Sequence, residues 1–284
     1  PENKKEKVER LRGSLIESVA ESSEEMLDKY FAGETFTNEE ILAGLRQGII
    51  NGDIAPVICG SAFNGLGTMD LLRAIINYAP SPNDVRTEKG VDEDGNEVEL
   101  KYDPNGKTVL FVFKTIADQY GRFSYFKVMN GDLTPDMTLV NSRTGASEKM
   151  GHIYIVKGKK NIEVDKIGCG DIGAVSKLTN TSTGDTLCAP GINIKLKGID
   201  FAEPCYSRAI APKVKGGEDK IASGLNRLRD EDPSFRVVNN AETKQMVISG
   251  AGDIHIDVIC SKLKNKFGVD VELSDPKVPY REKI

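Results

Sequence analysis

The stretch that follows the apolar run Pro56–Cys59 carries the residue types of a ligand-binding loop. Gly60, Ser61 and Ala62 come directly after this run, and a helix is predicted from Thr68 onward. A strand, a loop and a helix in this order form the unit of an open α/β sheet, whose ligands bind beyond the carboxyl ends of the strands. Taken alone, the Ser-Ala pair is equally compatible with a plain turn between a strand and a helix.

Three other patterns lack the structural context that their chemistry needs. Gly168–Gly173 matches G-x-G-x-x-G, but Ala174–Leu178 alternates like a strand, whereas a dinucleotide site needs a helix there. Gly106–Thr108 ends like a phosphate-binding loop, yet Lys101 stands where the first glycine is required. Asp92–Asn96 lacks two of the ligands of a calcium loop. We expect turns and strands at all three places.

The cysteines and histidines do not predict a metal site. Five cysteines are widely spaced with no C-x-x-C pair, and only His152 and His255 are present. Neither a zinc site nor a disulfide framework fits this pattern, so the sequence predicts no metal ligands and mostly buried, reduced thiols.

The charge is uneven along the chain. The net charge is -5, and residues 1–55 alone hold 12 acidic and 7 basic side chains, so the remainder is neutral. A basic stretch runs from Asn141 to Ile167, and within it Lys157, Lys159 and Lys160 are candidates for contact with phosphate. A solvated hairpin tip is the alternative interpretation. No apolar run approaches the roughly 20 residues of a membrane helix, so no membrane contact is expected.

Apolar periodicity predicts the elements. One long amphipathic helix is expected over Val8–Phe31, and a second begins at Thr37 with a capping-box pattern and ends at Gly52. Short β-branched and aromatic runs between Thr108 and Leu196 predict an all-β barrel. Beyond Pro204 the predicted order is βαββαβ, which is the ferredoxin-like arrangement.

The fold class is therefore multi-domain α+β. We expect residues 1–82 to be the end of an α/β domain with a helical insert over about 1–52, residues 83–106 to be a linker with one hairpin, residues 107–200 to be the barrel and residues 201–284 to be the ferredoxin-like domain. The chain starts at Pro1 without an initiator Met, and we expect it to be cut from a longer protein.

Several collinear motifs resemble elongation factor G. Cys59–Phe63 resembles the fifth guanine-nucleotide element at the end of the GTPase domain, and Asn180–Cys188 resembles the T-G-D-T-L signature of the second domain. Glu231–Phe235 and Gly250–Asp257 are similar to the third domain's E-D-P-T-F and G-M-G-E-L-H-L-E, and Tyr280–Ile284 is similar to Y-R-E-T-I. The resemblance covers nearly the whole chain.

The resemblance implies roles for particular residues. The backbone around Ser61, Ala62 and Phe63 would read guanine, and the lysine stretch and the third domain would contact the ribosome. The third-domain signature residues are Asp232, Pro233, Gly250, Gly252, Asp253 and His255. His255 is expected to cap or pack, because its sequence context offers no catalytic partners. Three acids at positions 230–232 oppose a helix dipole, which indicates either a functional turn or a helix ended by Pro233.

The resemblance also implies the activity of a longer parent protein. That parent would be a cytoplasmic, monomeric GTPase that uses GTP/GDP with Mg, binds ribosomal RNA and the ribosomal stalk protein, and promotes translocation of tRNA and mRNA. The phosphate-cradling and switch elements have no counterpart in these residues, so we expect this chain alone to be inactive and to carry no bound nucleotide. The acidic face of the helical insert would meet the stalk protein or simply be solvated.

Two alternatives remain. Asp253 and Asp257 replace the family's glutamates and Ala251 its Met, which leaves a divergent paralogue, a ribosomal protection protein or another translational GTPase open. A non-enzymatic RNA-binding scaffold is the alternative of another class, although the aromatic stacking strip of an RNA-recognition domain is missing.

Overall fold

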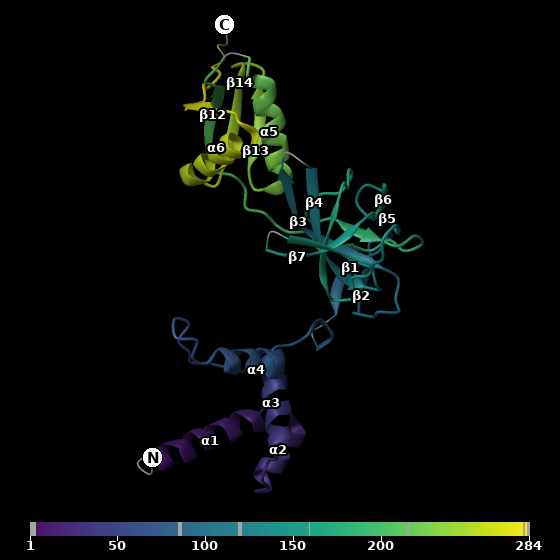
Figure 1. Cartoon of the computed structure of the whole chain (residues 1–284), viewed down its shortest axis with the longest axis vertical. Coiled ribbons are helices and arrows are strands. Elements are labelled where there is room, and N and C mark those ends of the chain that lie inside the picture. Colours follow the sequence, from purple (N-terminus) through teal and green to yellow (C-terminus); the bar gives the residue numbers. More distant parts are fainter. Residues whose placement is uncertain are drawn as a thin grey trace. The chain divides into compact units, whose positions relative to one another are not determined.

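The computed structural model describes residues 4–84, 87–118, 121–158, 160–214, 216–280 and 282, and the chain divides into two compact units, residues 1–86 and 87–284. Figure 1 shows the helices of the first unit in purple and blue and the sheets of the second in blue, teal, green and yellow. Lys159 and most of the terminal motif (Arg281, Lys283 and Ile284) lie outside the described residues.

The first unit is helical. Its elements are α1 (Lys5–Ala20), α2 (Glu24–Phe31), α3 (Asn38–Asn51), α4 (Thr68–Tyr78) and the short η2 (Pro82–Asp84). The prediction of one long helix was wrong, because the chain is extended at Ser23, whose side chain accepts a hydrogen bond from the Met26 amide and so starts α2 afresh. The capping box at Thr37 and Glu40 is confirmed, and Gly52 ends α3 in the left-handed conformation.

The segment before α4 is not a strand. Residues 54–60 have no sheet partner in the described part of the chain, and the nearest pairing is an isolated bridge between Ser61 and Leu66. Strand structure requires a hydrogen-bonded neighbour, so the apolar run Pro56–Cys59 alone does not produce it. Gly67, rather than Thr68, stands at the N-cap of α4, and the Thr68 hydroxyl donates to the Gly65 carbonyl.

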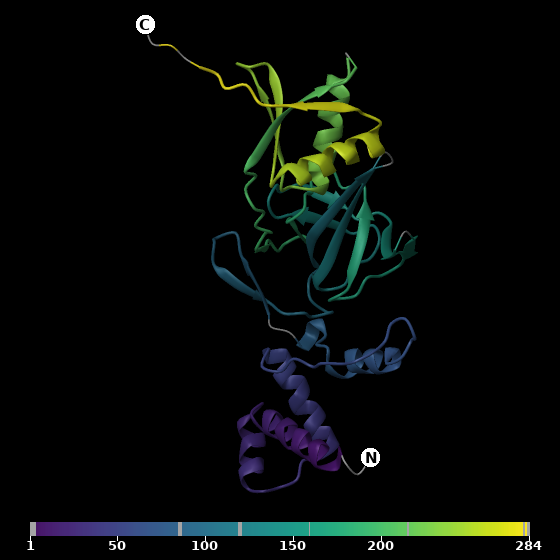
Figure 2. The same cartoon turned by 90° about the vertical axis from the view of Figure 1, so that its left-hand side faces the viewer.

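The second unit begins with a hairpin inside the segment expected to be a linker. Strands β1 (Glu88–Val91) and β2 (Glu97–Leu100) pair antiparallel across the Asp94–Asn96 turn, and β1 also pairs with β11 (Lys195–Leu196). Figure 2 shows this hairpin as a two-stranded blue ribbon. Leu100 is buried in a small core with Val109 and Met129, so the hairpin packs onto the barrel.

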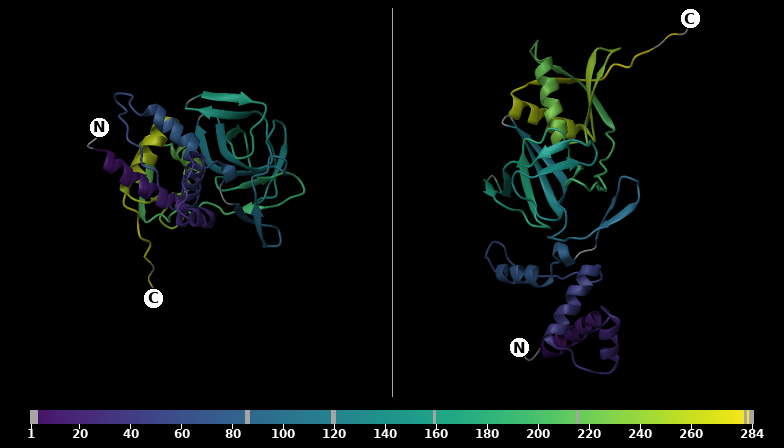
Figure 3. Two further views of the ribbon diagram at one scale, coloured as in Figure 1. Left: turned by 90° about the horizontal axis from the view of Figure 1, so that it is seen from below. Right: turned by 90° about the vertical axis from the view of Figure 1, so that its right-hand side faces the viewer.

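An eight-stranded antiparallel sheet curls into a half-barrel, as predicted for this region, and Figure 3 shows its teal strands from two further directions. The sheet order is β6-β5-β10-β3-β4-β9-β7-β8. The strands are β3 (Val109–Asp118), β4 (Gly121–Asn130), β5 (Thr138–Asn141), β6 (Ser147–Lys149), β7 (Ile153–Lys157), β8 (Lys160–Val164), β9 (Ile172–Ser176) and β10 (Thr186–Cys188). The strand β9 confirms that no helix follows the Gly168–Gly173 pattern.

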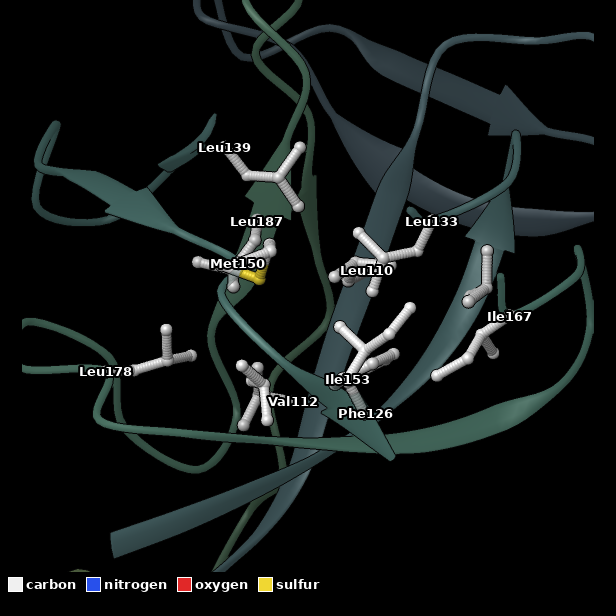
Figure 4. Close-up of a cluster of buried hydrophobic side chains, with 12 residues drawn as sticks. Leu110, Val112, Phe126, Leu133, Leu139, Met150, Ile153, Ile167, Leu178 and Leu187 are labelled. Carbon is white, nitrogen blue, oxygen red and sulfur yellow. The ribbon is translucent and has the colours of Figure 1, made fainter. Parts of the chain in front are cut away.

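Side chains from six of these strands and the loops between them fill the concave side of the sheet. Figure 4 shows them pointing toward one another around Phe126 and Leu110. Gly173 allows this packing, because a Cβ there would lie 2.3 Å from Ile167 Cδ1. The buried cluster comprises Leu110, Val112, Phe126, Val128, Leu133, Leu139, Met150, Ile153, Ile167, Val175, Leu178 and Leu187.

The remaining residues form the predicted ferredoxin-like domain. Its order is β12 (Tyr206–Pro212), α5 (Glu218–Glu231), β13 (Arg236–Asn240), β14 (Gln245–Gly250), α6 (Asp253–Phe267) and β15 (Val271–Ser274). The sheet order β13-β14-β12-β15 places the first and third strands in the centre. A second apolar core lies between this sheet and its two helices, and Phe235, Leu225 and Leu263 are among its fully buried members.

Candidate functional site

The loop between residues 59 and 68 is closed by two glycines. A Cβ at Gly67, whose φ is +78°, would lie 2.9 Å from the Cys59 carbonyl oxygen, and a Cβ at Gly60 would lie 3.0 Å from that of Leu66. Hydrogen bonds in both directions between Ser61 and Leu66 then fix the turn. The backbone of Cys59 and Gly60 can therefore lie directly beside the start of α4, which a side chain at either glycine would prevent.

This loop lines a cavity of about 440 Å³ whose walls include Ile58, Leu66 and Leu71. The Ser61 amide donates a hydrogen bond to the Leu66 carbonyl, whereas no described residue accepts a hydrogen bond from the Ala62 amide. One available backbone donor beside apolar walls fits a planar ring that carries a carbonyl oxygen. Ser61 and Ala62 thus lie at the cavity, whereas the Phe63 side chain is 99% exposed and does not line it.

The hairpin formed by β7 and β8 carries the candidate phosphate contacts. Lys157 and Lys160 are directly opposite each other in register, with Gly158 at φ +60° in the turn. Like charges in this position repel, and no described residue pairs with either ammonium. Ile155 and Ile162, the nearest cross-strand pair on the same face, are 37% and 41% exposed. The hairpin tip therefore offers a positive charge that has no counter-ion among the described residues.

The other cations of the predicted basic stretch are neutralised. Lys149 pairs with Asp136 at 2.9 Å, Lys166 with Asp132 at 2.5 Å, and Arg143 with Asp185 at 2.6 Å. Burial acts to raise the pKa of Asp185, but hydrogen bonds from Arg143, Asn141 and Ser182 hold it below its ordinary value. This carboxylate belongs to the T-G-D-T-L motif, and its partners show that the motif fixes a loop of the barrel.

The third-domain signature centres on His255. The Ala251 amide donates to its Nδ1 at 3.1 Å, and its Nε2 lies 3.1 Å from Asp232 Oδ2. The ring also packs edge-on against Phe235. Gly250 permits this, because a Cβ there would lie 2.9 Å from Nδ1. His255 thus joins the start of α6 to the turn after α5, in agreement with a packing role.

The other signature residues shape the same two turns. Asp232 follows the last residue of α5, and hydrogen bonds from Ser234 and His255 outweigh its burial and lower its pKa. Pro233 comes next, after the helix has already ended. Gly252 is the N-cap of α6, and Asp253 begins that helix, where its charge suits the dipole. These residues therefore shape the end of α5 and the start of α6.

Sequence reasoning missed the charged residues that join the barrel to the third domain. Arg122, at the start of β4, contacts Asp230 at the end of α5, and Lys266 in α6 contacts the Ala117 carbonyl. No local pattern identifies Arg122, because its partners are distant in sequence. The one feature of the sequence that pointed to this junction was the run of three acids at positions 230–232, which opposes the helix dipole.

The described residues contain no group of three or more His, Cys, Asp or Glu side chains arranged to hold a metal ion. Nor does any helix in the described part of the chain have the length and apolar character to cross a membrane.

Comparison with known proteins decides the family. The model of elongation factor G domain 2 matches residues 107–190, and the model of elongation factor G domain III matches residues 201–275, together more than half of the chain. The chain is an elongation factor G-like protein. The half-barrel and the ferredoxin-like domain are thus the second and third domains of that family.

A solved structure is similar to the chain over a longer range. A crystal structure of a Thermus thermophilus protein matches 99% of the chain with a TM-score of 0.82 and 27% sequence identity. The elongation factor G-like chain spans 40% of the length of that protein. The limits that we predicted for the individual domains, including residues 1–82 as the end of a GTPase domain, stay predictions.

Proposed function

We propose that the chain is part of a translation elongation factor that binds the ribosome and promotes GTP-dependent translocation of tRNA and mRNA. The observation that carries this proposal is the presence of both the second and the third domain of elongation factor G in collinear order. Cytoplasmic location, a monomeric state, and use of GTP or GDP with Mg by the longer protein belong to the same proposal.

The first unit would supply one wall of the guanine site. The free Ala62 amide beside the 440 Å³ cavity supports this role, because it would donate to the oxygen that distinguishes guanine from adenine. Phosphate and Mg would be held by residues outside this chain, since no phosphate-cradling loop occurs in it. The acidic helices before residue 52 would meet the ribosomal stalk protein.

Nucleotide binding by the longer protein tests the guanine site. Ala62→Pro removes the amide hydrogen, and we expect GDP to bind on the order of 3- to 10-fold more weakly, the cost of one lost hydrogen bond. Ala62→Gly keeps the amide and is the matched control. Equal affinity of the two variants for GDP would contradict the proposed role of Ala62.

The hairpin tip would contact ribosomal RNA. Lys157 and Lys160 are exposed cations to which no described carboxylate is paired, and such lysines are suited to phosphate. Lys159 lies outside the described residues and stays a prediction.

Cosedimentation with ribosomes tests this contact. We expect the double charge reversal Lys157→Glu and Lys160→Glu to weaken binding and to make it less sensitive to salt. Lys101→Glu with Lys114→Glu makes the same charge change at other exposed lysines of the second unit and is the control. If both double variants weakened ribosome binding equally, the effect would be one of net charge, and a specific contact at the hairpin tip would be contradicted.

A further inference from the structure

The barrel and the third domain have separate apolar cores. Every buried member of the barrel core lies between residues 110 and 187, and every buried member of the other core lies between 210 and 269. Residues 197–205, which connect the domains, contain no helix or strand. A junction without a shared apolar core leaves the orientation of two domains to the contacts at their surfaces.

Arg122 makes the central contact of this junction. One end of its guanidinium donates to the Thr181 carbonyl within the barrel, and Nη1 lies 3.4 Å from Asp230 Oδ2 on α5. Its Nε is buried without a hydrogen-bond partner among the residues that the structure describes, and only a quarter of the side chain is exposed. A planar guanidinium can serve two acceptors in fixed directions, so Arg122 holds both domains at once.

The barrel side of this contact is rigid. Glu148, which is 5% exposed, accepts hydrogen bonds from the Asn180 amide at 2.6 Å and the Thr181 hydroxyl at 3.0 Å. Asp185 accepts one from the Ser182 amide at 2.8 Å. Because these buried carboxylates fix the loop, the Thr181 carbonyl is a stationary anchor for Arg122.

The helix side carries an electrostatic conflict that the junction relieves. Asp230 and Glu231 stand in the last turn of α5, where the helix dipole disfavours negative charge. Glu231 pairs with Lys262 at 2.9 Å and Lys266 at 2.6 Å, both on α6. Asp230 instead pairs with Arg122 of the barrel. The Lys266 ammonium also contacts the barrel, because it lies 3.3 Å from the Ala117 carbonyl oxygen.

We propose that Arg122 is the positioning residue that sets the orientation of the third domain on the barrel, through a polar clamp with Thr181 and Asp230. Lys266 supports the clamp from α6. The T-G-D-T-L loop and the acidic turn after α5, which lie far apart in sequence, meet at this arginine. Loss of Arg122 should free the third domain while both folds persist, because neither apolar core includes it.

Rotational diffusion of the two domains within the whole chain tests the clamp. From ¹⁵N relaxation, we expect the barrel and the third domain of the unmodified chain to share one rotational correlation time. In Arg122→Ala the third domain should show the shorter time, with chemical shifts in both cores unchanged. Lys264→Ala, which removes an exposed ion pair with Asp270 inside the third domain, should keep the shared time.

Two further variants complete the test: one changes the partner, Asp230, and the other keeps the positive charge at Arg122. Asp230→Asn should free the third domain as Arg122→Ala does, and it decides the matter if that alanine variant fails to fold. Arg122→Lys keeps the charge beside Asp230 but loses the planar fork, and it should retain only part of the coupling. A shared correlation time in both Arg122→Ala and Asp230→Asn would overturn the proposal and assign the orientation to the packing of β3 against α5.

Discussion

The two units of the chain differ in how many of their apolar side chains are buried. In the described part of the first unit, the buried hydrophobic side chains are Val19 and Ala20, whereas Leu71, Ile75 and Ile76 on α4 are 49%, 52% and 74% exposed. In the second unit the apolar faces of the sheets close over two cores. An apolar stripe on a helix therefore shows that a face is built for burial, but not which segment covers it.

Truncation of a buried leucine should give the largest difference between the units. Leu110→Ala removes a side chain that is fully buried in the barrel, and we expect it to lower the free energy of unfolding by about 2–5 kcal/mol. Leu71→Ala on α4 should change it by less than about 0.5 kcal/mol, because that side chain is half exposed. Urea unfolding of both variants measures the two costs. Similar costs would contradict the assignment of the stable cores to the second unit.

A buried carboxylate of the second unit should have the next largest effect. Asp185→Asn weakens the bonds with Arg143, and we expect a loss of about 1.5–3 kcal/mol, the range for hydrogen bonds to charged groups. Asp275→Asn affects an ion pair whose carboxylate is 90% exposed and should be nearly neutral. Equal shifts of the urea midpoint in the two variants would show that burial of Asp185 is irrelevant to its contribution.

Helix capping should matter more in the first unit, which has little core to compensate. Thr37→Ala removes the capping box of α3 and should cost about 1 kcal/mol, seen as a loss of helical circular dichroism on mild heating. Thr35→Ala alters an exposed threonine that precedes the cap and is the control. If the two variants melted at the same temperature, this cap would not contribute measurably to the stability of α3.

Low pH should destabilise the same helix, by a smaller amount than loss of the cap. The hydrogen bonds from Lys29 and the Thr37 amide lower the pKa of Glu40 to about 2, from an ordinary value of 4.5. A lowered folded pKa means that this stabilisation is complete above about pH 4.5 and is lost as the pH falls toward 2. An NMR pH titration should find the low value, and Glu40→Gln should remove this part of the acid sensitivity. A Glu40 pKa near 4.5 would contradict it.

Much of the fold follows from local patterns, and the exceptions have physical causes. The βαββαβ order and the capping box are encoded by periodicity and by residues three positions apart. The break at Ser23 was missed because the apolar spacing continues across it. The strand at Pro56–Cys59 did not form because pairing is not a local property. At the candidate sites, Ser61 and His255 follow from motifs, whereas Arg122 depends on partners 59 and 108 residues away.

GTP hydrolysis in the presence of ribosomes tests the central claim most directly. The longer protein that contains this chain and the chain itself, residues 1–284, are assayed side by side with and without ribosomes. We predict ribosome-stimulated hydrolysis by the longer protein and none by the chain, because the residues that would hold the phosphates are absent from it. Hydrolysis by the chain alone, or no stimulation of the longer protein, would contradict the account.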